Sequence, residues 1–297
     1  MDDRAVGVLG ATSLVGDYLL PLLIQAGWSV TAFTRQTIKT SDDGPVWRQL
    51  ISSPAHQIEK LPCWICAAPI WALPDYFDLL HIYGAKRIVV LSSTSRFTKD
   101  DSPDFAERAV ARDLTNAETS VCDWAQRQGV EWIVLRPTMI YGKGKDRNVS
   151  DIARFIRRWH FFPLIGAGRG LRQPIHASDV AQFCVVALSN VDVKDRAFNL
   201  CGGETLSYRD MVERIGTAMA LPVRCIEVPR TLLRVGVKAL SFLSRFRSLS
   251  PALVDRMAQD LIFDGSEANR LLGVQPRNFV MTAGDLPLSG GVNNKRD

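Results

Sequence analysis

A short glycine-containing segment near the start of the chain has the composition of a phosphate-binding loop. Residues 10–16 read Gly-Ala-Thr-Ser-Leu-Val-Gly and lie between an expected strand, residues 5–9, and an expected helix, residues 14–26. A residue without a side chain lets the backbone turn sharply and approach a pyrophosphate, toward which the N-terminus of the following helix directs a partial positive charge. We therefore expect a dinucleotide here, the alternative being a tight turn that binds no ligand. Gly10 is expected to make the turn and Gly16 to let helix and strand pack closely. The residues of this loop expected to bind the cofactor are Gly10, Thr12, Ser13, Leu14, Val15 and Gly16.

The residues after the second expected strand bear on which dinucleotide is bound. This strand, residues 29–33, is followed by Thr34 and Arg35, and the first acidic residue after it is Asp42. Sites for NAD usually place an acid at this point to hold the ribose hydroxyls. The guanidinium of an arginine can instead pair with a 2′-phosphate. We predict NADP as the cofactor, with NAD and a merely solvated Arg35 as the alternatives.

The order of apolar runs and helical patterns predicts a doubly wound parallel sheet. Strands are expected at residues 5–9, 29–33, 61–67, 87–91 and 131–135, with helices at 14–26, 75–83 and 105–128 between them. Further along, the pattern predicts helices at 148–159 and 178–189, strands at 171–176 and 198–200, and a helix capped by Ser207. Ser178 is expected to cap the helix that begins there.

The predicted organisation is a Rossmann-type domain over residues 1–145, a smaller substrate or lid part over 146–281, and a polar tail over 282–297. The short strand at 198–200 is expected to return to the main sheet, so that the two parts interweave.

Composition and charge exclude several classes of protein. The chain is 46% hydrophobic and 23% charged, as in ordinary globular proteins, and carries a net charge of +5. We expect a cytoplasmic protein because no signal peptide and no membrane-spanning apolar run is visible. No nucleic-acid-binding pattern is seen. The basic segment at residues 230–247 could lie on a membrane surface, but a packing or lid role is favoured.

The six cysteines are expected to be reduced and buried, with no metal site. Cys63 and Cys66 form a C-x-x-C sequence, but it lies in a strand pattern that directs the two sulfurs to opposite faces. A redox or zinc role would require a helix N-terminus or a second ligand pair.

Seven segments together resemble the extended and atypical short-chain dehydrogenases/reductases, also called the NAD-dependent epimerase/dehydratase family. They are residues 8–16, 67–69, 90–94, 135–142, 173–181, 198–205 and 272–277, in order over residues 4–280. The resemblance implies that Ala67, Ala68 and Pro69 line the adenine-ribose side of the cofactor. It also implies that Ser92 and Ser93 contact the cofactor, that Thr94 is catalytic, and that Pro137, Thr138 and Ile140 lie beside the nicotinamide.

The tyrosine and lysine that this family uses for proton transfer are missing. Their expected positions are occupied by Val110 and Leu114, and no tyrosine occurs between Tyr83 and Tyr141. Residues 141–145 have the Y-x-x-x-K spacing, but their two glycines argue against the helix that would bring the two side chains together.

Other polar residues carry weaker expectations. Asp179 is expected to support a helix N-terminus, and Arg108 and Arg112 either approach the cofactor or are solvated. The resemblance implies an NADP(H)-dependent oxidoreductase or epimerase-like enzyme with atypical catalytic residues, acting on a small substrate that could be nucleotide-linked. The alternative is a non-catalytic NADP-binding protein with a structural or redox-sensing role.

Overall fold

The computed structural model describes residues 4–35, 44–50, 59–229, 231–232 and 256–287. The chain divides into two compact units, each made of three segments. The first consists of Met1–Thr138, Ala177–Cys201 and Asp264–Pro276, and the second of Met139–His176, Gly202–Phe263 and Arg277–Asp297.

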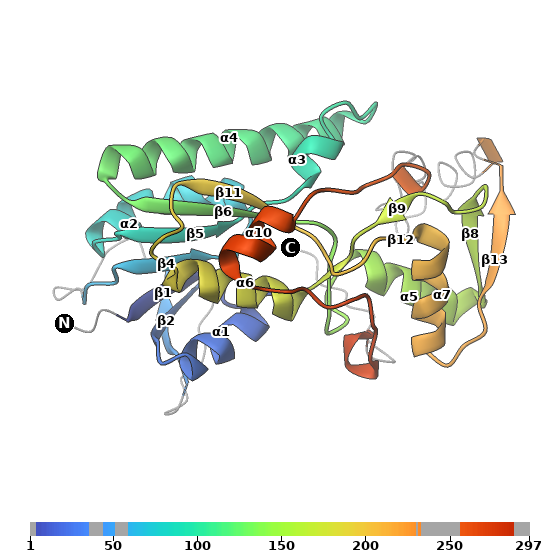
Figure 1. The fold of residues 1–297 in the computed structure, drawn as a ribbon, viewed down its shortest axis with the longest axis horizontal. Coiled ribbons are helices and arrows are strands. Elements are labelled where there is room, and N and C mark those ends of the chain that lie inside the picture. The colour runs from blue at the N-terminus through green and yellow to red at the C-terminus, as the bar shows by residue number, and fades with distance from the viewer. Residues whose placement is uncertain (1–3, 36–43, 51–58, 230, 233–255, 288–297) are drawn as a thin grey trace. The chain divides into compact units, whose positions relative to one another are not determined.

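The first unit contains a seven-stranded sheet whose strands are all parallel (Figure 1). Its strands are β1 (Ala5–Leu9), β2 (Ser29–Thr34), β3 (Val46–Gln49), β4 (Cys63–Cys66), β5 (Arg87–Leu91), β6 (Glu131–Pro137) and β11 (Arg196–Leu200). They follow the order β11-β6-β5-β4-β1-β2-β3, so the direction of winding reverses between β1 and β4. The predicted doubly wound parallel sheet is therefore confirmed.

Helices cover both faces of this sheet (Figure 1). On one face α1 (Gly16–Gln25) packs against α6 (Ala177–Ser189), and on the other η1 (Ile70–Tyr76) packs against α4 (Phe105–Gln128). Two short helices, α2 (Phe77–Ile82) and α3 (Ser95–Thr98), precede α4, and α10 (Ser266–Leu272) packs against β11 and α6. Strands β1 and β5 are buried along their whole length, as expected of strands covered on both sides.

The helix at residues 105–128 has the bounds that its sequence predicts. The side chain of Asp104 accepts a hydrogen bond of 2.8 Å from the N–H of Ala106 and caps the first turn. Gly129 ends the helix with a left-handed φ of +66°.

Strand β4 carries the C-x-x-C sequence, as predicted. Burial raises the pKa of the Cys66 thiol to about 12, although the carbonyl of Ala68 accepts a weak hydrogen bond from it. All six cysteines are free. The described residues contain no cluster of His, Cys, Asp and Glu side chains that could hold a metal ion.

The second unit is built on three small two-stranded sheets. They pair β7 (Ile140–Tyr141) with β10 (Ile175–His176), β9 (Leu171–Arg172) with β12 (Leu206–Ser207), and β8 (Phe161–Ile165) with β13 (Arg224–Val228). Helices α5 (Asn148–Trp159) and α7 (Tyr208–Ala218) pack against each other beside them, and η3 (Ala283–Asp285) is a short turn near the end of the described chain. Ser207 and Asp210 form a reciprocal cap at the start of α7, which confirms the predicted cap.

Several local expectations need correction. Helix α6 begins at Ala177, so Ser178 lies inside its first turn rather than capping it. The strand expected at residues 171–176 is two short strands, β9 and β10, with Gln173 and Pro174 between them. The helix expected at 75–83 begins earlier, as the 3₁₀ segment η1. Strands β3, β8 and β13 were not expected.

Strand β11 pairs with β6 and joins the main sheet, so the predicted interweaving is confirmed. Nearly all of the basic segment at 230–247, the end of the tail and Asp42 lie outside the described residues. Among the helices that are described, none is long and apolar enough to cross a membrane.

Candidate functional site

The parallel strands bring most of the predicted site residues to one edge of the sheet. The loop at residues 10–16 follows β1, Arg35 follows β2, residues 67–69 follow β4, residues 92–94 follow β5, and Pro137 and Thr138 stand at the end of β6. Because carboxyl ends of parallel strands share an edge, these segments gather there, which we call the carboxyl edge. Ile140 belongs to the second unit. The reversal of winding lies between β1 and β4, the position where doubly wound sheets bind ligands.

Gly10 is required by a close approach of two strand ends. Its φ is +75°, and a Cβ built on it would lie 2.2 Å from the backbone nitrogen of Ala68. The loop after β1 therefore lies directly against the residues after β4. A side chain at position 10 would collide with protein backbone before it could obstruct a ligand.

The rest of the loop leads into α1. A Cβ on Gly16 would lie 2.2 Å from the carbonyl oxygen of Ala11, so this glycine permits the close packing of the start of α1 against the loop. The hydroxyl of Ser13 accepts a hydrogen bond of 3.0 Å from the N–H of Gly16. Within the described residues, the N–H groups of Leu14 and Val15 donate no hydrogen bond and remain available at the helix N-terminus.

Arg35 is exposed and directly follows β2. Its carbonyl oxygen accepts a long hydrogen bond of 3.5 Å from the side chain of Gln49. In the part of the chain that the structure describes, no carboxylate pairs with its guanidinium.

The hydroxyls after β5 are directed toward neighbouring protein groups. Thr94 is 5% exposed, and its hydroxyl donates to the carbonyl oxygen of Pro137 at 3.2 Å, as does its N–H at 3.1 Å. Ser93 accepts a hydrogen bond from the N–H of Ser95 at 3.1 Å. In this arrangement the Thr94 oxygen can accept a hydrogen bond from a ligand, but its proton is committed to Pro137.

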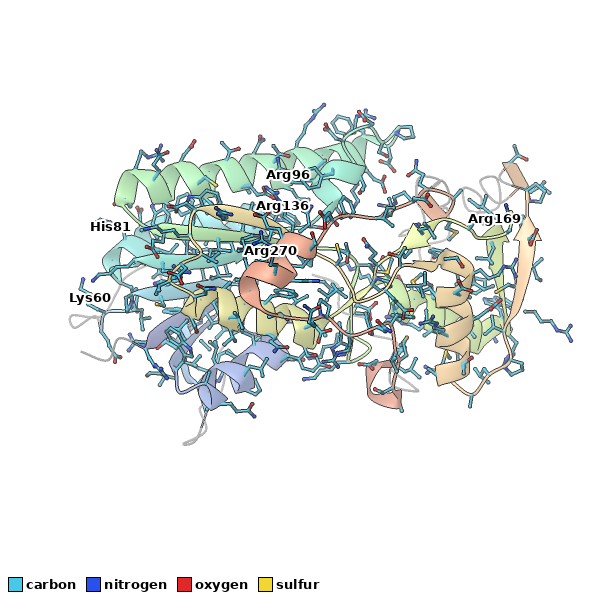
Figure 2. All side chains as sticks on the ribbon, in the orientation of Figure 1. Lys60, His81, Arg96, Arg136, Arg169 and Arg270 are labelled. Atoms are coloured by element: carbon cyan, nitrogen blue, oxygen red, sulfur yellow. The ribbon has the colours of Figure 1, made fainter. Side chains whose placement is uncertain are left out.

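A buried carboxylate, Glu118 on α4, joins the ends of β5 and β6. Its side chain is 5% exposed and accepts a hydrogen bond of 2.5 Å from Ser92, while Arg136 donates from Nε at 3.1 Å and from Nη2 at 2.6 Å. Arg96 on α3 also pairs with it. Figure 2 shows Arg96 and Arg136 near one another, close to α4. The sequence patterns did not predict this cluster, although the acid on the long helix and the Arg-Pro pair after it could have indicated it.

The face of α4 that should carry the family's tyrosine and lysine is apolar. Leu114 is buried in the core under α4, and Val110 packs against the same core half-buried. Arg108 donates to the carbonyl oxygen of Ser102 at 2.6 Å and stacks on Phe105. Arg112 is exposed.

Tyr141 lies in the second unit, fully buried in β7. Its ring forms T-shaped contacts with the rings of His176 and Phe279, at centroid distances of 5.1 and 4.8 Å. Residues 142–144 have positive φ, so the Y-x-x-x-K spacing at 141–145 is not helical, as predicted.

His176 is paired with an acid that the sequence analysis missed. Its Nε2 lies 3.0 Å from Oδ1 of Asp285, and both side chains are buried. Burial would raise the pKa of Asp285, but hydrogen bonds from His176 and Thr282 outweigh it and hold that pKa well below the usual range. Asp179 is buried in the first turn of α6, a position where an acid stabilises the helix N-terminus.

An open hollow of about 480 Å³ lies elsewhere on the first unit, along α1 and β3. It is lined by Asp17, Leu20, Pro21, Ile24, Gln25, Pro45 and Trp47. None of the predicted site residues lines it.

Part of the chain matches the sequence model of a known protein family. Residues 75–201 match the sequence model of the NAD dependent epimerase/dehydratase family. The chain is 21% identical over 162 residues to UDP-glucose 4-epimerase of Vibrio cholerae, covering 54% of this chain and 47% of the relative. It is 25% identical over 201 residues to an uncharacterized protein of Sinorhizobium fredii, covering 65% and 50%. The chain thus spans about half the length of these curated relatives.

Solved structures share the fold at low sequence identity. A nucleoside-diphosphate-sugar epimerase from Staphylococcus aureus has a TM-score of 0.67 at 14% identity, covering 92% of this chain and 97% of that one. UDP-glucuronic acid 4-epimerase from Bacillus cereus, in complex with NAD, has a TM-score of 0.66 at 12% identity, covering 92% and 93%. Residues 75–201 thus match the model of the NAD dependent epimerase/dehydratase family, and the chain has the Rossmann-like fold of these structures.

Proposed function

We propose that this chain binds a nicotinamide dinucleotide at the carboxyl edge and acts as an oxidoreductase or epimerase-like enzyme. The observation that carries the proposal is the loop at residues 10–16, which lies where the winding of the sheet reverses and leads into α1. The small substrate is proposed to be a nucleotide sugar, the class named for the epimerases of Vibrio cholerae and Bacillus cereus.

The residues of the carboxyl edge fit a dinucleotide. The N–H groups of Leu14 and Val15 would bind the pyrophosphate, together with the other loop residues Gly10, Thr12, Ser13 and Gly16. Residues 67–69 would line the adenine-ribose side, and Ser92, Ser93, Pro137, Thr138 and Ile140 the nicotinamide side. When bound, the nicotinamide ring would accept or return a hydride.

Arg35 supports a preference for NADP(H). It occupies the end of β2, where an NAD site usually places an acid, and its exposed guanidinium has no carboxylate partner in the described residues. A guanidinium at this point can pair with the 2′-phosphate that distinguishes NADP from NAD.

Thr94 remains the proposed catalytic residue, in a limited role. Because its proton is donated to Pro137, its oxygen would hold a substrate hydroxyl by accepting a hydrogen bond. Neither Val110 nor Leu114 can exchange a proton, so Thr94 would orient the substrate and would not act as its general acid.

Titration of NADPH and NADH against the wild type and Arg35→Ala tests this proposal. We expect NADPH to bind more tightly to the wild type, and Arg35→Ala to weaken it by roughly ten- to hundredfold while leaving NADH nearly unchanged. Arg127→Ala is the matched control, because Arg127 is an exposed arginine in the last turn of α4. Equal affinities in the wild type would reject the NADP preference, and binding of neither dinucleotide would reject the proposed function.

A further inference from the structure

Glu118 connects four elements of the first unit through a single carboxylate. It projects from α4 and accepts hydrogen bonds from Ser92 after β5, from Arg96 on α3 and from Arg136 on β6. Its side chain is 5% exposed, whereas the two guanidinium side chains are 21% and 17% exposed. The carboxylate is therefore the buried centre of the cluster, and the segments that it joins include two ends of the carboxyl edge.

The chemistry of these partners determines where the Ser92 proton lies. A carboxylate only accepts hydrogen bonds, so in the 2.5 Å contact between Ser92 Oγ and Glu118 Oε1 the proton belongs to Ser92 and is directed toward Glu118. The remaining lone pairs of Ser92 Oγ are acceptors. A ligand at this edge would therefore be met by an acceptor, which suits a ribose hydroxyl or a carboxamide N–H and does not suit a phosphate oxygen.

The two arginines are held in place by the same charge. Both guanidiniums stack on the ring of Phe97, at 5.1 Å for Arg96 and 5.4 Å for Arg136 from the ring centroid. Without the carboxylate, two like charges would share one partly buried site, and α3 would lose its ionic link to β6.

We infer that Glu118 is a positioning residue of the proposed cofactor site. It fixes Ser92 as a hydrogen-bond acceptor and holds α3 and the end of β6 in place beside it. This inference rests on the proposed function for the statement that Ser92 contacts the dinucleotide. The statement that Glu118 holds the segment after β5, α3 and the end of β6 in place depends only on the contacts described above.

The same helix supplies a matched control. Glu107 is also a buried glutamate of α4 and also accepts a hydrogen bond from a serine, with Ser102 Oγ at 2.7 Å. Its serine partner, Ser102, is not one of the three residues that bind Glu118. A general effect of removing a buried carboxylate from α4 should appear in both Glu107→Gln and Glu118→Gln.

Dissociation constants for NADPH test the link to the cofactor. We expect Glu118→Gln and Ser92→Ala each to raise the constant about tenfold, as for loss of one hydrogen bond between the ligand and the Ser92 hydroxyl. The double variant should bind NADPH no more weakly than the single variant with the higher dissociation constant, because both changes remove the same oriented hydroxyl. Glu107→Gln should stay within about twofold of the wild type, after correction for the folded fraction by thermal unfolding.

Hydrogen exchange of the full chain without cofactor tests the placement. Glu118→Gln should raise exchange at the amides of residues 92–98, 136 and 138, and Glu107→Gln should not. Unchanged exchange there would overturn the inference, as would additive losses in the double variant or an equal loss in Glu107→Gln. If the wild type binds no dinucleotide, the proposed function fails, and the exchange result still decides whether Glu118 positions these segments.

Discussion

Glycines with a left-handed backbone serve two different purposes in the first unit. Gly129 ends α4 at φ +66°, and a Cβ there would meet nothing within 4 Å. Gly10 has a similar φ of +75°, but a Cβ there would lie 2.2 Å from the backbone of Ala68. Position 129 requires glycine only for its left-handed backbone. Position 10 requires glycine for its left-handed backbone and also because two strand ends approach closely there.

This difference predicts unequal costs for the same substitution. Gly129→Ala should lower the free energy of unfolding by about 1–2 kcal/mol, the cost of a left-handed backbone with a side chain. Gly10→Ala should cost about 2–5 kcal/mol, because overpacking against backbone is added to the same strain. Urea unfolding followed by circular dichroism measures both. Equal costs would show that the strand ends can separate freely, and a larger substitution such as Gly10→Val cannot isolate ligand binding from folding.

At the scale of elements, a buried hydrogen bond between Asp285 and His176 joins η3 to β10. Asp285 accepts hydrogen bonds from His176 at 3.0 Å and from the hydroxyl of Thr282 at 2.7 Å, and its backbone carbonyl accepts one from Gly144 at 3.0 Å. The pKa of Asp285 is depressed in the folded protein, although burial alone would raise it. A depressed pKa stabilises the folded state above the ordinary Asp pKa of about 4, and this contribution is lost as pH falls toward the folded-state value.

Asp285→Asn should therefore have a pH-dependent cost. At pH 7 we expect the variant to be about 1–3 kcal/mol less stable than the wild type. The difference should shrink as the pH is lowered below about 4, because the wild type then loses the same contribution. Urea unfolding at several pH values measures this, with Asp192→Asn, an exposed acid, as the control. A difference that stays constant down to low pH would contradict the assignment.

At the scale of the whole molecule, the chain passes between its two units several times. Strand β11 joins the sheet beside β6, and α6 packs against α1. Both β11 and α6 follow Met139–His176 in the sequence, a segment that belongs to the second unit. Helix α6 buries Phe183, Cys184, Ala187 and Leu188 in this unit. The Rossmann-type unit therefore lacks α6 and β11 until residue 200 has been reached, and its last segment, Asp264–Pro276, comes later still.

A fragment of residues 1–145 should for this reason fail to fold cooperatively. It lacks β11 and α6, so apolar surface of the sheet and of α1 would be exposed to water. A fragment of residues 1–276 contains all three segments of the first unit and should recover a cooperative urea transition, measured by circular dichroism beside the full chain. Cooperative unfolding of fragment 1–145 at the midpoint of the full chain would support a domain boundary near residue 145.

The sequence by itself determined those features that depend on consecutive residues. Helical periodicity predicted the observed bounds of α4 and α5, and Gly129 marked the end of α4. The cap at Ser207 depends only on residues 207–210, so the local sequence was enough to predict it. The alternation of strands and helices predicted the parallel sheet, whose geometry then gathers the loop at 10–16, Arg35 and Thr94 at one edge.

Only the tertiary structure decided which distant residues meet. Glu118 draws its partners from three other elements, His176 finds Asp285 109 residues away, and Gly10 is required by the backbone of Ala68. Short strands such as β3 and β13 likewise depend on a neighbour for their hydrogen bonds. Periodicity and capping act within a few residues along the chain. The partner of a buried charge or a close backbone contact depends on how the elements cross, which no local pattern encodes.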